Sequence, residues 1–334
     1  MKTKFAKGGH VKTTVIGAFP KISDEIGGQK LRRALHQFDR EEISRDLLDL
    51  VFDETTTAAI AQMEQAGINV VNDGQIRWDD LLAPFASAWG GVSRGPLERF
   101  YDTNTYFRQP VITGPIKTDG QTLVADFKLA QRSAKSAQVK ASVCGPLTFA
   151  TLAEDQCYQS FEERLAAVTA AIAREIQGLE AAGASLVDVE DPAIVARPEL
   201  IGAGKEAYLL LGALSVPIAL QTYFFPADRV IEELVDFHVA QIGIDVRSRE
   251  TKVVGKLGRL PQTVVLGVVD ARNTRIESAD EVADRILEAL KIVPSEQLWV
   301  APTTSLEYLP HDVAVRKLLA LYNGAQLTGA LYHG

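Results

Sequence analysis

The sequence predicts an α/β protein built as a (β/α)8 barrel, and three observations support this fold class. Eight short apolar runs rich in Val and Ile recur along the 334 residues. Most of them do not alternate with polar residues, which is typical of parallel strands buried on both faces. Helical patterns separate the runs, and eight strands in a chain of this length favour a barrel over a doubly wound open sheet. The runs are residues 13–19, 68–74, 140–146, 185–191, 217–223, 242–246, 263–269 and 298–304.

Three helical patterns between these runs have recognisable ends. The pattern over 41–67 closes on Gly67 and the pattern over 160–183 closes on Gly183, and glycine is the usual residue just past a helix C-terminus. A third helix is predicted over 279–293. We therefore expect one barrel domain over residues 12–330, preceded by a tail over residues 1–11.

One segment breaks the alternation, because residues 77–139 hold no clean helix between the second and third strands. This stretch predicts a hairpin that turns at Asp119-Gly120 and is followed by a helix. We expect this excursion to fold over the barrel mouth.

Composition and charge narrow the function classes. A net charge of −8 and a sequence pI near 5.3 disfavour nucleic acid and acidic membranes as partners. Cys144 and Cys157 are too few for a disulfide framework and match no zinc spacing, which indicates a reducing, cytoplasmic setting. No apolar run reaches the roughly 18–20 residues of a membrane span, and the basic start lacks the apolar core of a secretory signal.

Polar residues gather where the predicted strands end, which is where barrel enzymes place their active sites. Buried acids are costly unless they are paired, so one interpretation is a set of structural ion pairs. The other is an active site, since acids with perturbed pKa values cluster in catalytic clefts. The ion-pair interpretation joins Glu190, Asp245 and Asp270 to Arg77, Arg247 and Arg272.

Histidine and cysteine chemistry is not favoured. None of His10, His36, His238, His311 and His333 lies at a strand end, so general-base chemistry would fall to a carboxylate. No residue near Cys144 in the sequence would activate its thiol, and a packing role is the better interpretation.

Several of these strand ends carry a resemblance to a known family. The segments VIGAFPK, GINVVNDGQIRWDD, VCGPLTFA, GASLVDVEDPAI and APTTSLEYLP, with FYDTNTYFRQPVITGP of the excursion, occur in order along residues 12–325. They resemble the catalytic half of cobalamin-independent methionine synthase, and more closely its short "core" forms. The resemblance implies a (β/α)8 barrel of the superfamily that also contains uroporphyrinogen decarboxylase.

The resemblance also implies a zinc site that holds the homocysteine sulfur, and this chain departs from it. The family's His-x-Cys, Glu and Pro-x-Cys-Gly ligands match Gln221, Tyr223, Asp245 and Thr304 here. Zinc takes Cys, His and carboxylate ligands, and only Asp245 belongs to those types. We therefore expect no tightly bound cofactor, although the family itself implies zinc.

The implied amino-acid pocket differs as well. Ala18 replaces a Ser, Gln75 a Glu, Glu190 an Asp and Arg272 a His of the family pattern. Trp78, Tyr106, Phe107 and Arg108 are candidates for a donor-binding lid, with an aromatic mini-core under the excursion as the alternative. The expected catalytic residues are Asp245, Glu190, Arg272 and Tyr223, and the expected substrate-binding residues are Ala18, Asp73, Gln75, Asp188, Gln221 and Thr304.

Three functions remain open from the sequence. The first is a methyltransferase that moves a methyl group from a methyl-corrinoid or methyl-folate donor to homocysteine or another small thiol. The second is a metal-free lyase or decarboxylase, in which the acids and arginines bind a carboxylated substrate. The third is a binding protein for an amino acid or a corrinoid protein partner. A homodimer is compatible with all three.

Overall fold

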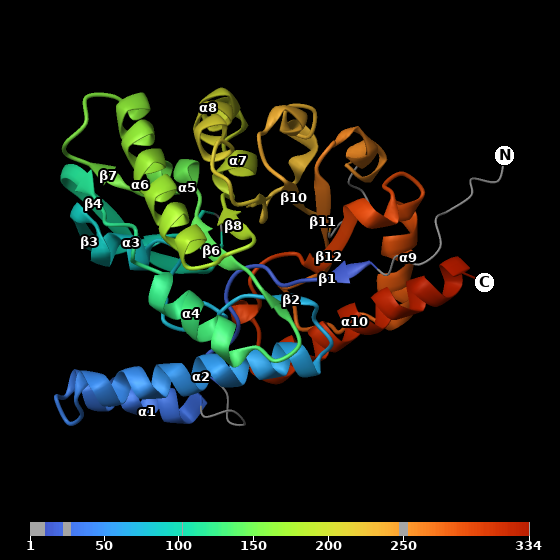
Figure 1. Cartoon of the computed structure of the whole chain (residues 1–334), viewed down its shortest axis with the longest axis horizontal. Coiled ribbons are helices and arrows are strands. Elements are labelled where there is room, and N and C mark those ends of the chain that lie inside the picture. Colours follow the sequence, from blue (N-terminus) through green and yellow to red (C-terminus); the bar gives the residue numbers. More distant parts are fainter. Residues whose placement is uncertain (1–10, 23–27, 102, 247–252, 334) are drawn as a thin grey trace.

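The computed structural model describes residues 11–22, 28–101, 103–246 and 253–333. Parallel strands form one curved sheet in the order β1-β12-β11-β10-β9-β8-β6, with helices packed around it (Figure 1). All eight predicted strands are present. They are β1 (Lys12–Thr13), β2 (Val70–Val71), β6 (Ala141–Cys144), β8 (Val187–Glu190), β9 (Ile218–Gln221), β10 (Gln241–Asp245), β11 (Thr263–Val269) and β12 (Leu298–Pro302).

Backbone contacts close this sheet into a barrel. Thr14 forms a parallel bridge with Val70, which joins the end of β1 to β2. Strand β2 pairs in turn with β5 (Gln138–Val139), and β5 runs directly into β6 at the far edge of the sheet. The chain therefore returns to its own edge, and β2 and β5 bridge the space between β1 and β6.

The helices begin and end largely where the sequence predicts. Helix α2 (Arg45–Gln65) is capped by the Ser44 side chain, which accepts from the Leu47 amide at 3.3 Å. Gly67 has a φ of +83°, the left-handed conformation that glycine adopts readily, so the chain turns away after α2. The remaining helices are α1 (Gly28–Asp39), α3 (Ala83–Ala88), α4 (Val124–Ser133), α5 (Pro146–Leu152), α6 (Phe161–Ala181), α7 (Ala193–Ala196), α8 (Ile201–Leu211), α9 (Ala279–Leu290) and α10 (His311–His333).

Helices do not follow every strand. Between β9 and β10 the chain holds only the 3-10 turns η2 (Ala227–Arg229) and η3 (Leu234–Asp236). Between β10 and β11 the described residues hold only η4 (Val254–Arg259). The other 3-10 turns are η1 (Pro198–Leu200), η5 (Ser295–Gln297) and η6 (Leu306–Tyr308). None of the helices in the described ranges is long and apolar enough to cross a membrane.

The excursion is a hairpin, but the predicted turn was wrong. Strand β3 (Gly90–Arg99) pairs antiparallel with β4 (Tyr106–Lys117), and Arg99 lies opposite Tyr106, so the turn falls within 100–105. Asp119-Gly120 instead connects β4 to the predicted helix, α4. Gly120 has a φ of +76°, and a side chain there would overlap the Arg174 carbonyl, so this glycine serves packing on α6 and not a hairpin.

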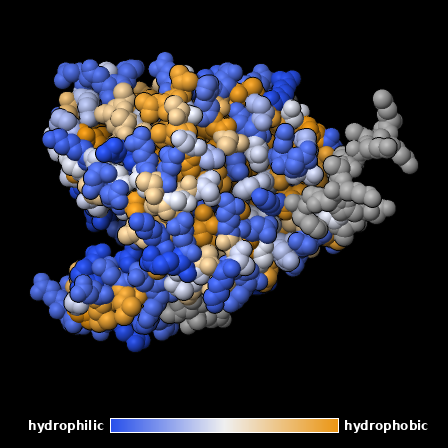
Figure 2. Space-filling view, viewed as in Figure 1, coloured by the Kyte–Doolittle hydropathy of each residue, from blue (hydrophilic) through white to orange (hydrophobic). Residues whose placement is uncertain are grey.

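The excursion and the first helices shape the surface. β3 and β4, with β7 (Glu154–Asp155) beside β4, lie at one side of the barrel, while α1 and α2 lie side by side along the bottom of Figure 1. Figure 2 shows a hollow on this face between the α1–α2 pair and the rest of the molecule. Hydrophilic residues cover most of the face shown.

Candidate active site

A cavity of about 270 Å³ opens at the carboxyl ends of the strands, where the sequence analysis placed the site. Its floor comes from residues at or just after the ends of β2, β8, β9 and β12. Residues at the turn end of the β3–β4 hairpin line one side. The lining residues are Ala18, Gln75, Trp78, Asp79, Asp80, Leu81, Phe100, Thr105, Tyr106, Phe107, Glu190, Tyr223, Ser305, Glu307 and Tyr308.

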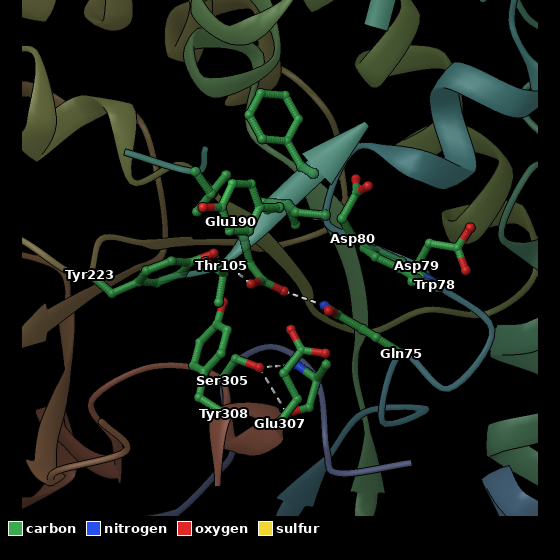
Figure 3. A pocket seen from close by; sticks show the side chains of 15 residues that line it. Gln75, Trp78, Asp79, Asp80, Thr105, Glu190, Tyr223, Ser305, Glu307 and Tyr308 are labelled. Atoms are coloured by element: carbon green, nitrogen blue, oxygen red, sulfur yellow. Dashed lines mark hydrogen bonds between the residues drawn. The ribbon is translucent and has the colours of Figure 1, made fainter. Parts of the chain in front are cut away.

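Glu190, the last residue of β8, is the centre of the cavity. Only 1% of its surface is exposed, and it accepts hydrogen bonds from the Gln75 side-chain amide and, at 2.9 Å, from the Tyr223 hydroxyl. Figure 3 shows these two side chains reaching the Glu190 carboxylate from different sides. Burial, and then repulsion from Asp188, raise the pKa of Glu190 to about 8, although both hydrogen bonds act to lower it. Glu190 is therefore a carboxyl group that changes charge near neutral pH.

The chain after β2 is folded to present Gln75 to this carboxylate. The backbone amide of Gly74 donates to Asn72 Oδ1 at 2.9 Å, and the backbone amide of Gln75 donates to Asp73 Oδ1 at 3.0 Å. These two consecutive turns leave Gln75 with a φ of +49°, which is uncommon for a residue with a side chain. Asp73 lines a separate small space with Lys140. Asp73, an expected substrate-binding residue, therefore does not line the cavity, and its side chain holds the turn.

A second layer of polar residues lies beneath the cavity. The Lys140 ammonium is 2.5 Å from Asp188 and 2.8 Å from the Val15 carbonyl, and the Gln221 amide donates to Asp188 at 3.1 Å. Lys140, Asp188 and Gln221 are all almost completely buried. Asp188 precedes Glu190 by two residues, so both side chains face inward but at different depths. Asp188 and Gln221, both expected to bind substrate, therefore lie beneath the cavity and do not line it.

Comparisons with known proteins identify the family of this chain. Residues 11–326 match the family model described as the catalytic domain of cobalamin-independent synthase. The chain belongs to the cobalamin-independent methionine synthase family. It is 27% identical over 317 residues to a methionine synthase of Sulfurisphaera tokodaii, covering 94% of this chain and 91% of that protein. It is also 27% identical over 323 residues to one of Saccharolobus solfataricus, covering 94% of each.

Solved structures confirm the barrel fold. A B12-independent methionine synthase from Shewanella sp. W3-18-1, in complex with selenomethionine, superimposes with a TM-score of 0.84 at 19% identity, covering 97% of this chain and 99% of that one. A putative vitamin-B12 independent methionine synthase from Listeria monocytogenes gives a TM-score of 0.76 at 17% identity, covering 93% and 96%.

The residues at the family's zinc positions do not fit a zinc ion. Gln221 and Tyr223 direct their donors to carboxylates within the protein, and the buried Thr304 hydroxyl meets no hydrogen-bond partner in the described ranges. Asp245 is buried, is the one carboxylate among the four, and does not line the cavity. Among the described residues, no three His, Cys, Asp or Glu side chains are grouped so that they could hold a metal ion. Zinc sites use three or four such ligands, so this donor set is unsuited to zinc.

The arginines near the strand ends lie outside the cavity. Arg77 is 2.6 Å from both Asp49 and Asp53 on α2 and 3.0 Å from Asp126 on α4, so it forms structural ion pairs, but with helix carboxylates. Arg272 lies over the Phe224 ring and does not line the cavity. Arg247 falls outside the described residues. The interpretation in which Glu190 forms a structural ion pair with Arg77 or Arg272 was therefore wrong.

The residues predicted to bind the methyl donor do not all line the cavity. Trp78, Tyr106 and Phe107 line the cavity, whereas Arg108 is exposed and its backbone amide donates to Asp80 at 3.0 Å. The Phe107 ring packs on Phe100 at 5.8 Å, so the aromatic mini-core offered as the alternative also exists. The same rings thus form a small core and one wall of the cavity.

Sequence reasoning did not select several cavity residues. Asp80 and Glu307 follow strand ends and were candidates on that ground, but neither they nor Tyr308 were chosen as site residues. Burial raises the pKa of both Asp80 and Glu307. Ser305 exchanges hydrogen bonds of 3.1 and 3.0 Å with the Ala18 backbone, so a hydroxyl stands beside Ala18, where the resemblance implies that a Ser has been lost.

Cysteine and histidine take no visible part in the cavity. Cys144 is fully buried, and burial raises the pKa of its thiol well above the usual value, which fits the predicted packing role. No described histidine lines the cavity. His311 lies instead at the start of α10, beside Gln62 and Phe19.

Proposed function

We propose that this protein transfers a methyl group from a methyl-folate or methyl-corrinoid donor to homocysteine or another small thiol, and that it does so without zinc. The observation that carries the proposal is Glu190, a buried carboxyl group at the centre of the cavity at the strand ends. Its pKa of about 8 lies close to the value of about 8.5 for an ordinary thiol. Proton transfer between the two groups is then nearly balanced in free energy, as efficient general-base catalysis requires.

In the proposed step the ionised Glu190 carboxylate accepts the proton of the acceptor thiol. A sulfur electron pair then forms a bond to the methyl carbon, while the bond from that carbon to the donor breaks and its electrons stay on the donor. The leaving nitrogen of a methyl-folate takes up a proton in this step, and the proton held by Glu190 balances it, whereas the cobalt of a methyl-corrinoid keeps the electron pair. Gln75 and Tyr223 hold the carboxylate in place through their hydrogen bonds. Because no metal holds the thiolate in this scheme, the cavity walls must position the sulfur close to the methyl carbon.

The cavity walls support an amino-acid acceptor. Four carboxylates line the cavity, namely Asp79, Asp80, Glu190 and Glu307, and none of the described lining residues is basic. Such a surface favours an ammonium group. Six aromatic side chains also line it and suit the flat ring of a folate donor.

The test is methyl transfer from 5-methyltetrahydrofolate to homocysteine, compared between the wild-type protein and Glu190→Gln. We expect kcat/KM of the wild type to rise with pH through about 8, because Glu190 must lose its proton before it can act as a base. Glu190→Gln should lower kcat/KM by about 10²–10⁴-fold, the usual contribution of a general base. Glu175→Gln is the control for removing a buried carboxylate outside the cavity: it should destabilise the fold, but kcat/KM of the folded protein should stay near the wild-type value.

A lyase or a binding protein is less well supported by the geometry. A lyase for carboxylated substrates needs a cation that stabilises the developing anion, and no arginine of the described ranges lines the cavity. Undetectable methyl transfer to any small thiol, from either donor class, would reject the proposal and leave these two alternatives.

A further inference from the structure

A second hollow lies beside the active-site cavity. It measures about 420 Å³ and shares Thr105 and Tyr308 with the cavity as a common wall. Its character is different, because its described lining includes a cationic side chain and no carboxylate. The lining residues are Thr103, Asn104, Thr105, Phe224, Arg272 and Tyr308.

Arg272 carries the charge of this hollow and has no acidic partner in the part of the chain that the structure describes. Its guanidinium carbon lies 5.4 Å from the centre of the Phe224 ring. Asp270, on the same turn, accepts instead from the Arg272 backbone amide at 2.8 Å and from the Asn273 side chain at 2.6 Å. The guanidinium therefore stays available to a ligand, unlike that of Arg77 with its three carboxylates.

Phe224 gives this arginine a fixed support. Phe224 is 5% exposed and packs against Tyr223, Phe100 and Tyr308 with ring centres 4.8, 5.8 and 5.9 Å apart. Its φ of +72° is unusual for a bulky residue, and such conformations cluster at functional sites. Phe224 also directly follows Tyr223, the hydrogen-bond donor to Glu190, so one short segment serves both the cavity and the hollow.

The charges of the two spaces complement each other. A carboxylate would be repelled by those acids of the cavity that are ionised, yet homocysteine and folate both carry carboxylates. Lys21, beside the cavity, donates to the Trp78 carbonyl, and its charge acts on Glu307. Across the shared wall, Arg272 offers a planar group that pairs with a carboxylate through two hydrogen bonds.

We propose that Arg272, supported on Phe224, forms a carboxylate-binding subsite for a substrate whose reacting part lies in the acid-lined cavity. This inference rests on the proposed methyl-transfer function and assigns Arg272 to substrate binding. The carboxylate has two sources, the glutamate tail of a folate donor or the α-carboxylate of the thiol acceptor. Both present the same chemistry to the guanidinium.

Binding measured by calorimetry on the full chain separates the sources, because each ligand has a partner without the carboxylate. The donor pair is 5-methyltetrahydrofolate and the methylamide of 5-methyltetrahydropteroate, which has no free carboxylate, and the acceptor pair is homocysteine and 3-aminopropane-1-thiol. We expect Arg272→Gln to weaken one carboxylate-bearing ligand by about 10–100-fold and to leave its partner unchanged. Arg272→Lys should weaken the same ligand less, since it keeps the charge without the planar pair of donors. Arg259→Gln, an exposed arginine on η4, is the control and should change nothing.

Each outcome decides the inference. A selective loss in the donor pair assigns the subsite to the folate tail, and a selective loss in the acceptor pair assigns it to the α-carboxylate. Equal binding of all four ligands by Arg272→Gln and the wild type overturns it, as does a wild type that binds none of them. Binding is measured without turnover, so it is tested separately from methyl transfer. If the wild type transfers methyl groups but Arg272→Gln binds all ligands as the wild type does, the Arg272 subsite is overturned and the proposed function stands.

Discussion

Replacing Glu190 by glutamine should make the protein more stable at high pH. The pKa of Glu190 is about 8 in the folded protein, against 4.5 for an ordinary glutamate. Between these two pH values the folded protein binds more protons than the unfolded chain, so the free energy of unfolding falls as pH rises. A difference of about 3.5 pH units corresponds to roughly 5 kcal/mol at about 1.4 kcal/mol per unit. We therefore expect a gain on the order of 3–5 kcal/mol above pH 8.

The glutamine side chain introduced by Glu190→Gln resembles the protonated acid in shape and can keep both contacts. Its oxygen can accept from Gln75, and its amide can donate to the oxygen of Tyr223 once that hydroxyl turns. The variant should therefore match the wild type near pH 4.5 and exceed it increasingly up to pH 8.

Urea unfolding at intervals from about pH 5 to pH 9 measures this difference, with the slope m checked for constancy. Glu175→Gln provides the contrast, because Glu175 accepts hydrogen bonds from Trp89 at 2.9 Å and from Thr118 and Thr122 at 2.5 to 3.1 Å, and its loss should destabilise the fold. A difference between Glu190→Gln and the wild type that stays constant across this pH range would refute the reasoning.

Three further predictions follow from the cavity and the layer beneath it. Lys140→Met should lower the free energy of unfolding by about 3–5 kcal/mol in urea, because it strands the buried Asp188 charge, and adding Asp188→Asn should recover part of this loss. Tyr223→Phe removes a hydrogen bond that lowers the pKa of Glu190, so the kcat/KM profile should shift to higher pH; an unchanged profile would contradict the assigned contact. Elemental analysis of protein purified without chelator should find less than stoichiometric zinc, and stoichiometric zinc that disappears in Asp245→Ala would show that unexpected ligands bind it.

Local sequence signals predicted the elements well where they act over a few residues. Gly67 and Gly183 mark the ends of α2 and α6 because both adopt positive φ values of +83° and +93°. Asp119-Gly120 failed as a hairpin turn because a positive φ at Gly120 serves equally well for close packing against α6. A turn dipeptide indicates the conformation of one residue and not the partner of the strand before it.

The cavity could be predicted in part. Glu190, Gln75 and Tyr223 came from strand ends together with the family resemblance, and they meet in one hydrogen-bonded group. Asp188 and Gln221 also belong to the barrel interior, but they lie one layer deeper. A period of two residues gives the face of a strand and does not give depth along the barrel axis.

The sequence by itself determined the eight strands, the barrel and the acidic character of the strand ends, since each depends on residue type and short-range order. Only the tertiary structure decided which charges meet. In the folded chain Lys140 pairs with Asp188, Arg77 pairs with carboxylates on the helices, and Arg272 lies across a shared wall from the cavity of Glu190. These pairings depend on contacts between residues far apart in the chain, and Coulomb energies change steeply with the distance and burial that only the folded chain sets.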